Sequence, residues 1–200
     1  MEMQDKDIKE FISETAVLDP KFSIKKVENI KDFSLLIKNL IFELAVFEKM
    51  EIQCEITEPG LVIDYEWAKA TKFNGKEVKD RFYELSVVTM EETCEKTGKK
   101  TEAVVGFAIY YLKYDMKSGL GFFLEDLYVK DEYRGCGLGT SLWRFVIRDI
   151  LSKHKATYMQ WTVLSWNTRA IDFYVKYKSR NLTTLNETHF FRILRETIHI

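Results

Sequence analysis

The chain has 200 residues, of which 46% are hydrophobic and 30% are charged, and its formal net charge is -1. These values are typical of a single globular domain that can bury a sizeable core. Proteins that bind nucleic acid or anionic membranes are usually basic, so we expect neither partner. Cys54, Cys94 and Cys136 lie far apart and have no metal-ligand or disulfide spacing, so we expect no metal site.

The N-terminal segment predicts a cytoplasmic location. It carries Glu2, Asp5, Asp7 and Glu10, whereas a signal peptide needs a basic start followed by an apolar run. No apolar stretch approaches the ~18 residues that are needed to span a bilayer. Residues 1–20 are expected to form an extension with a short amphipathic helix, and residues 21–200 the main domain.

The first part of the main domain predicts a strand, a helix and a second strand. Phe22–Val27 alternates like a strand, and Asp32 is expected to cap an amphipathic helix that runs to Phe47. The sequence Glu58–Gly60 is interpreted as a break between elements. Arg81–Met90 is rich in β-branched and aromatic residues, which indicates a strand.

The second part begins with a predicted antiparallel hairpin, formed by Ala103–Tyr114 and Leu120–Val129. An amphipathic helix is expected over Thr140–Lys153 and a strand over Thr157–Leu164. Asn167 is a favourable N-cap for a helix that reaches about Tyr177.

A last strand is predicted at His189–Leu194. In this order, strands pair locally at first and later alternate with helices. The pattern indicates an α/β (α+β mixed) fold, in which helices flank a mixed and mostly antiparallel central sheet.

A glycine-rich segment, Arg134-Gly135-Cys136-Gly137-Leu138-Gly139, lies between a predicted strand and a predicted helix. Glycines let the backbone approach a ligand closely, and a helix start offers unpaired N–H groups, so the segment could bind a phosphate. No lysine follows Gly139, which excludes a P-loop, and the GxGxG spacing does not fit a dinucleotide loop. Taken alone, the segment could also be a connection without a ligand.

Three further motifs place this loop in context. The stretches "VGFAIYYLKYD", "FLEDLYVKDEYRGCGLGTSLW" and "WNTRAIDFY" together resemble the GNAT N-acetyltransferase superfamily, and in particular its diamine acetyltransferase branch (spermidine/spermine and thialysine acetyltransferases). "ELAVFEKM" is similar to the first helix of that branch. The resemblance covers roughly Phe22 to Arg195. It implies a GNAT fold, acetyl-CoA as cosubstrate, a small primary amine as acceptor, direct transfer in a ternary complex, and a homodimer.

The resemblance also assigns roles to residues. Tyr174 is expected to protonate the departing CoA thiolate, and Glu125 to help deprotonate the amine through a water molecule. The residues implied in substrate binding are Glu48, Asp115, Glu125 and Asp126, with Glu48 reaching the substrate from its own or the partner subunit. The residues implied in acetyl-CoA binding are Leu127, Tyr128, Val129, Arg134, Gly135, Cys136, Gly137, Leu138, Gly139, Thr140, Asn167 and Tyr174.

Glu125 and Asp126 are adjacent in a predicted strand, so strand alternation predicts that their side chains point to opposite faces of the sheet. Cys136 sits beside Arg134 at a helix start, where the pKa of a thiol can fall. Direct transfer needs no thiol, so we interpret Cys136 as part of the loop and not as a nucleophile.

Two positions depart from the pattern of the branch. Lys117 replaces an aromatic residue, and a cation near the substrate disfavours a long polycation relative to a short diamine or a lysine analogue with a carboxylate. Lys178 replaces a glycine after the "FY" helix, so the end of this helix is expected to differ.

Two other functions stay open from the sequence. One is acetylation of a protein lysine or N-terminal amine, for which an open, shallow channel is expected. The other is a CoA-binding module without catalysis.

Overall fold

A computed structural model describes residues 18–66, 72–73, 76–77, 81–93, 98, 100–153, 156–177 and 179–183. The chain divides into two compact units, Met1–Thr162 and Val163–Ile200. The predicted N-terminal helix, with most of the extension at residues 1–20, and the predicted strand His189–Leu194 lie outside the described residues.

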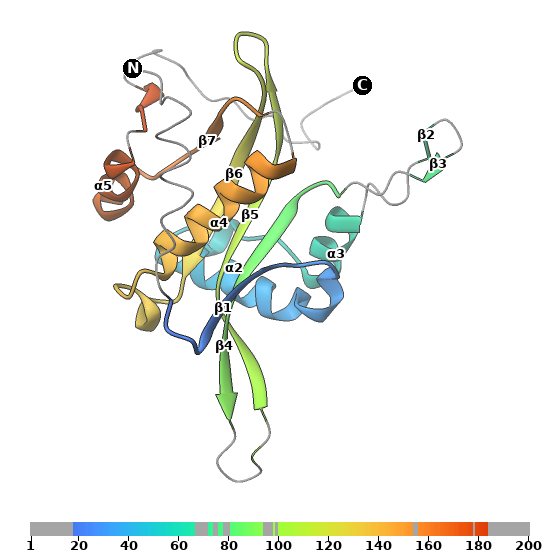
Figure 1. The fold of residues 1–200 in the computed structure, drawn as a ribbon, viewed down its shortest axis with the longest axis vertical. Coiled ribbons are helices and arrows are strands. Elements are labelled where there is room, and N and C mark those ends of the chain that lie inside the picture. Colours follow the sequence, from blue (N-terminus) through green and yellow to red (C-terminus); the bar gives the residue numbers. More distant parts are fainter. Residues whose placement is uncertain are drawn as a thin grey trace. The chain divides into compact units, whose positions relative to one another are not determined.

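The first unit is built on a five-stranded sheet with the strand order β1-β4-β5-β6-β7 (Figure 1). Its strands are β1 Phe22–Lys26, β4 Glu84–Thr93, β5 Lys100–Asp115, β6 Gly119–Val129 and β7 Met159–Trp161. The first four are antiparallel neighbours, whereas β7 runs parallel to β6. The prediction of a mixed, mostly antiparallel sheet is therefore confirmed. The short strands β2 Lys72–Phe73 and β3 Lys76–Glu77 pair separately.

Helices cover both faces of the sheet, which explains the long apolar run in β5. Val104–Tyr110 is buried on both sides, and a strand in this position loses the polar alternation of a one-sided sheet. In Figure 1, α4 (Leu138–Lys153) crosses one face, and α2 (Ser34–Phe47) and α3 (Glu58–Glu66) lie on the other.

The main core lies on the face with α2 and α3. It joins residues of β4, β5 and β6 to the apolar sides of these helices. Its fully or nearly buried members are Val27, Ile30, Ile37, Leu40, Leu61, Tyr65, Tyr83, Leu85, Val87, Val104, Phe107, Ile109 and Tyr128. On the other face, α4 buries Leu142, Val146 and Ile150 at the helical spacing that the sequence predicted.

The structure corrects several predicted boundaries. The strand expected over Thr157–Leu164 is limited to the three residues of β7, Met159–Trp161. Asp32 ends a short 3-10 helix, η1 (Ile30–Asp32), and α2 begins at Ser34, so Asp32 is not its N-cap. The sequence at Glu58 is not a break, because α3 begins there, with Pro59 in the first turn, where its missing N–H leaves no hydrogen bond unmade. The Glu58 carboxylate also accepts a hydrogen bond of 2.7 Å from the Ser34 hydroxyl, which ties the starts of the two helices together.

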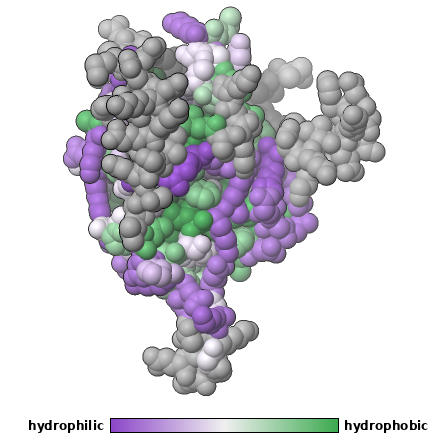
Figure 2. Space-filling view, in the orientation of Figure 1, coloured by the Kyte–Doolittle hydropathy of each residue, from purple (hydrophilic) through white to green (hydrophobic). Residues whose placement is uncertain are grey.

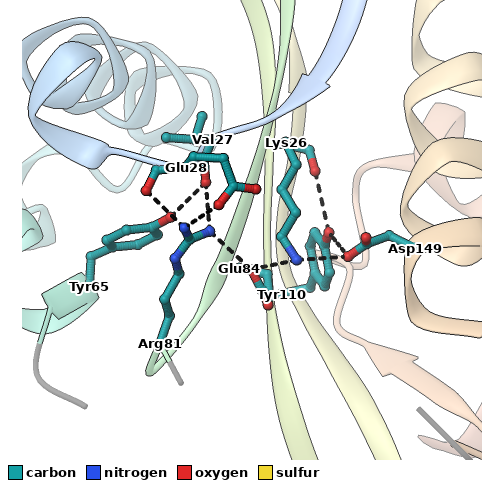
Figure 3. Close-up of polar contacts among 9 residues, drawn as sticks. Lys26, Val27, Glu28, Tyr65, Arg81, Glu84, Tyr110 and Asp149 are labelled. Atoms are coloured by element: carbon teal, nitrogen blue, oxygen red, sulfur yellow. Dashed lines mark hydrogen bonds and ion pairs between the residues drawn. The ribbon is translucent and has the colours of Figure 1, made fainter. Parts of the chain in front are cut away.

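A polar network joins three strands to α4 (Figure 3). The Lys26 ammonium lies 2.8 Å from Glu84 Oε2 and 3.1 Å from Asp149 Oδ2, and the side chains of Lys26 and Asp149 are only 11% and 12% exposed. Tyr110 donates a hydrogen bond of 2.8 Å to the same Asp149 oxygen. The network therefore pins the C-terminal half of α4 to β1, β4 and β5.

Arg81 explains why β4 begins later than predicted. Its guanidinium donates to the Val27 carbonyl at 2.8 Å and to the Glu28 carbonyl at 2.8 Å, so it holds the end of β1 and does not pair as a strand residue (Figure 3). The strand starts three residues later, at Glu84.

The second unit contains α5, Thr168–Lys176. The Asn167 side chain accepts a hydrogen bond of 3.2 Å from the Ala170 N–H, as expected of an N-cap. At the other end, the Ser179 hydroxyl donates to the Tyr174 carbonyl at 2.7 Å. The same carbonyl also accepts the Tyr177 N–H at 3.0 Å, so a backbone donor and a side-chain donor close this helix end together. Lys178 itself lies outside the described residues.

None of the helices in the described part of the chain is long and apolar enough to cross a membrane. In Figure 2, hydrophobic residues show through in the middle of the visible face, and hydrophilic residues border them.

Candidate active site

The Glu125 and Asp126 side chains lie on the same face of the sheet, and not on opposite faces as strand alternation predicted. Tyr110 pairs with Leu124 and Ile109 pairs with Asp126, so two residues of β5 face three positions of β6. Glu125 is therefore the extra residue of a β-bulge. The bulge shifts the alternation by one position and turns both carboxylates toward the face of α2 and α3.

Tyr111 holds the first of these acids. Its hydroxyl donates a hydrogen bond of 3.0 Å to Glu125 Oε2. Burial and the nearby charges of Glu125 and Asp126 raise the pKa of Tyr111 to about 12, so the phenol keeps its proton at neutral pH. The sequence did not mark Tyr111 as a site residue. Tyr111 lies two residues after Ile109, so its side chain is on the same face of the sheet as that of Ile109. Only the bulge shows that both acids lie on this face as well.

Asp126 and Glu48 complete an acidic cluster with the exposed Glu125. Burial, with the neighbouring carboxylates of Glu125 and Glu48, raises the pKa of Asp126 to about 7. Burial also raises the pKa of Glu48, which follows the last residue of α2. Glu48 thus approaches Asp126 within one chain. A carboxylate that titrates near neutral pH can accept a proton from an amine and release it again.

Asp115 is not brought to this cluster. It pairs with Gly119 at the tip of the β5–β6 hairpin, six residues of β6 from Glu125, which corresponds to roughly 20 Å along a strand. Its carboxylate accepts the N–H groups of Lys117 and Ser118 at 2.8 and 3.0 Å, and these bonds lower its pKa. Asp115 therefore closes the turn, and the exposed Lys117 lies in that turn.

The outer edge of β6 changes at Glu125. The parallel pairing with β7 runs from Phe122 to Leu124 and ends there, although β6 continues to Val129. Leu127, Tyr128 and Val129 lie in this continuation, where the resemblance places the pantetheine arm of acetyl-CoA. An extended ligand can pair with a strand edge in the manner of an added strand.

The glycine loop directly follows the strand. Gly135 and Gly137 have φ values of 87° and 89°, which a residue with a Cβ rarely adopts. Gly139 lies in the first turn of α4, and a Cβ added there would meet no protein atom within 4 Å. Neither its backbone angle nor protein packing demands a glycine there, and a close ligand would explain it. The Ser141 N–H is bonded to the Gly137 carbonyl at 3.0 Å, so the N–H groups of Leu138 and Gly139 precede the bonded part of the helix.

Arg134 points back toward α2 and does not extend along the loop. Its Nε donates to the Val129 carbonyl at 2.7 Å, and its Nη1 lies 3.0 Å from Asp131 Oδ1. The guanidinium also lies over the rings of Phe47 and Tyr128, at 5.0 and 5.3 Å from their centres. In this arrangement Arg134 fixes the start of the loop.

Two other loop residues lie beside the glycines. The exposed Cys136 thiol donates to the Tyr133 carbonyl at 3.1 Å. Thr140 lies in the first turn of α4, directly after Gly139. Among the described residues, no group of His, Cys, Asp and Glu side chains is arranged to hold a metal ion.

Tyr174 lies in α5 of the second unit, with its ring 5.1 Å from that of Phe173. Burial raises the pKa of the Tyr174 phenol, so it is protonated at neutral pH and can donate a proton. Asn167 caps the same helix, which makes α5 the element that carries both predicted residues.

The fold and the strand-loop-helix geometry define an acyltransferase of one known class. The model of the Acetyltransferase (GNAT) family matches residues 61–178, and the chain belongs to this family. It is therefore an acetyltransferase, of a family that uses acetyl-CoA.

Comparisons with individual proteins are more specific than the family match. The thialysine N-epsilon-acetyltransferase of Bos taurus is 34% identical over 163 residues, which cover 81% of this chain and 87% of that protein. The spermidine/spermine N(1)-acetyltransferase-like protein 1 of Homo sapiens is 31% identical over 81% of this chain and 21% of that longer protein. Among solved structures, an aminoglycoside N-acetyltransferase in complex with CoA has a TM-score of 0.60 at 15% identity, over 90% of this chain and 99% of that one. The structural likeness supports the GNAT fold.

Proposed function

We propose that this acetyltransferase moves an acetyl group from acetyl-CoA to the primary amine of a small cationic substrate, either a diamine or a lysine-like amino acid. The observation that carries the proposal is the cluster of Glu48, Glu125 and Asp126 on one face of the sheet, directly before the strand edge and the glycine loop. A cluster of carboxylates favours a cation. The names of the relatives, which include thialysine acetyltransferases, point to the same class of substrate.

We propose direct transfer in a ternary complex, in which the acidic cluster meets the amine and the cofactor elements hold acetyl-CoA. In the proposed step, the amine nitrogen forms a bond to the acetyl carbon and the carbon–sulfur bond breaks. The ammonium first loses one proton to Glu125 and Asp126, directly or through a water molecule, and the neutral amine attacks. The nitrogen loses a second proton to water as the amide forms, while Tyr174 gives its proton to the CoA thiolate and regains one from solvent. The products are the N-acetylated amine and CoA with a free thiol. Holding the two substrates side by side can by itself supply about 7–11 kcal/mol of the barrier.

Each cofactor-binding residue has a proposed task. The backbone of Leu127, Tyr128 and Val129 pairs with the pantetheine arm, and an N–H group of this edge polarises the thioester carbonyl. The residues proposed to hold the pyrophosphate, through backbone N–H groups at the start of α4, are Gly135, Cys136, Gly137, Leu138, Gly139 and Thr140, with Arg134 supporting the loop. Asn167 positions α5, which carries Tyr174.

The pH dependence of the reaction follows from the acidic cluster. Asp126 has a raised pKa of about 7 and faces Glu125, Glu48 and Tyr111. Protonation below pH 7 removes the negative charge that binds the ammonium and accepts its proton. We therefore expect kcat/KM to fall as the pH falls through about 7.

The direct test measures free thiol released from acetyl-CoA in the presence of putrescine, spermidine, lysine or thialysine. Turnover with at least one of them is expected. Tyr174→Phe should lower kcat by ~10²-fold, as loss of a general acid commonly does. Acetylation of a peptide lysine without turnover of any small amine would contradict the proposal, and so would tight binding of CoA with no turnover at all.

We also propose that the enzyme is a homodimer. The outer side of α2 leaves a row of apolar side chains at least 40% exposed, namely Leu35, Leu36, Phe42, Val46 and Phe47. An exposed apolar surface of this kind is typical of an interface. Sedimentation equilibrium is expected to give twice the mass of the 23.7 kDa chain.

A further inference from the structure

Lys113 is a cation on the same face of the sheet as the acidic cluster. It follows Tyr111 by two positions in β5, so both side chains project from one face. Its ammonium donates a hydrogen bond of 2.7 Å to Gln160 Oε1 of β7 and lies 5.5 Å from the centre of the Phe123 ring. Two contacts from different strands therefore hold the ammonium in one place.

An aromatic pair separates Lys113 from Glu125. The rings of Tyr111 and Phe123 stack with their centres 5.5 Å apart. Phe123 contacts Lys113, and Tyr111 donates its hydroxyl to Glu125 at 3.0 Å. The face thus carries a row of a cation, two rings and an acid. We call these four residues, Lys113, Phe123, Tyr111 and Glu125, the charge row.

The ammonium of Lys113 retains capacity for an anion. An ammonium has three donors, and the hydrogen bond to Gln160 uses one of them. The next acid on this face, Asp115, directs Oδ1 to the N–H groups of Lys117 and Ser118 in the hairpin turn, and the charge of Lys113 adds only a smaller contribution to its lowered pKa. Among the described residues, no carboxylate forms an ion pair with Lys113 within 4.0 Å.

We propose that Lys113 binds the carboxylate of the substrate, so that the enzyme prefers a lysine-like amino acid to a diamine or a polyamine. The inference rests on the proposed function and selects between the two substrate classes that it allows. The reacting ammonium meets Glu125 and Asp126, the aliphatic chain lies over the Tyr111 and Phe123 rings, and the far carboxylate meets Lys113. Tyr111 and Lys113 are about 7 Å apart along the strand, which is comparable to the length of a lysine side chain.

The same cation opposes a diamine. A second ammonium in place of the carboxylate would lie beside Lys113, and like charges repel each other. A hydrogen bond between an ammonium and a carboxylate is stronger than one between neutral groups. We therefore expect Lys113 to change the ratio of kcat/KM values for the two substrate classes by about 10- to 100-fold.

Lysine and cadaverine form the matched substrate pair for the test, because cadaverine is lysine without its carboxylate. The wild-type enzyme should have the higher kcat/KM for lysine. Lys113→Met should lower kcat/KM for lysine by about 10- to 100-fold and leave the value for cadaverine unchanged or raised. Lys113→Arg keeps the charge and should keep the preference for lysine. The control is Lys100→Met at the opposite end of β5, where the lysine pairs with Glu91 at 2.7 Å.

The outcomes separate this inference from the proposed function. If the wild type acetylates both amines and Lys113→Met changes both kcat/KM values by the same factor, Lys113 does not bind the carboxylate of the substrate. A lost preference in Lys113→Arg with an unchanged melting temperature would also overturn it. A wild type that acetylates neither these amines nor putrescine, spermidine or thialysine would overturn the proposed function first.

Discussion

Replacing Asp126 by asparagine should stabilise the protein at alkaline pH. In the folded chain, burial and the charges of Glu125 and Glu48 raise the pKa of Asp126 from 3.8 to about 7. The folded state therefore holds the Asp126 proton more tightly than the unfolded state. The stability that this proton contributes is fully present below pH 3.8 and is lost as the pH rises through about 7.

The size of the effect follows from the two pKa values. They differ by about three pH units, and each unit corresponds to 1.36 kcal/mol, which sets a limit of about 4 kcal/mol. Part of the Asp126 side chain reaches solvent, which weakens the effect, so we expect about 2–4 kcal/mol. Asp126→Asn does not titrate. Its free energy of unfolding should rise by this amount relative to wild type between pH 4 and pH 8.5.

Urea denaturation of both proteins at pH 4, 5.5, 7 and 8.5 measures this difference. Comparing the change between pH values cancels any packing difference between aspartate and asparagine. Asp172→Asn, an exposed position on α5, is the matched control and should stay within ~0.5 kcal/mol of wild type. If the difference between Asp126→Asn and wild type is the same at all four pH values, Asp126 is not held in a repulsive, buried cluster. The variant should also lose activity, because it lacks the carboxylate that is proposed to bind the substrate ammonium. A substrate-binding group that costs the fold stability is a common trade-off in enzymes.

Gly106→Ala should lower the free energy of unfolding by about 1–3 kcal/mol in urea denaturation, because its Cβ would lie 2.7 Å from the Tyr128 carbonyl oxygen; an unchanged midpoint would contradict this. Gly139→Ala should leave stability unchanged or raise it by up to about 1 kcal/mol, since its Cβ meets no protein atom within 4 Å, but it should raise the KM for acetyl-CoA at least ~10-fold. An unchanged KM would remove Gly139 from the cofactor site. Lys26→Met should destabilise by about 1–3 kcal/mol, because it removes the ammonium that lies 2.8 Å from Glu84 and 3.1 Å from the 12% exposed Asp149 carboxylate. Lys26→Met with Asp149→Leu should recover part of this loss, and a strictly additive double variant would contradict the pairing.

Local patterns in the sequence were sufficient for most elements of the fold. The hairpin of β5 and β6 follows from two β-branched and aromatic runs around a short turn, and α4 follows from helical spacing of its apolar residues. Asn167 was predictable as a cap because its hydrogen bond reaches only three residues along the chain. Boundaries failed where a distant partner decides them. Arg81, for example, leaves the strand because the carbonyl of Val27 lies within reach of its guanidinium.

The acids and glycines between Glu125 and Gly139 were recognisable from the sequence, because residue type and spacing along one strand and one loop define them. The faces that these side chains take were not. A β-bulge is a mismatch between two strands, so Glu125 and Asp126 turn to one face only because β5 pairs with β6 in that register. In the sequence, no feature distinguishes Lys113 from any other lysine in a strand. It became a specificity candidate when the sheet placed Gln160, more than forty positions away in the chain, within hydrogen-bond distance of its ammonium. Spacing along the chain sets which groups are present, and tertiary pairing sets which of them share a surface.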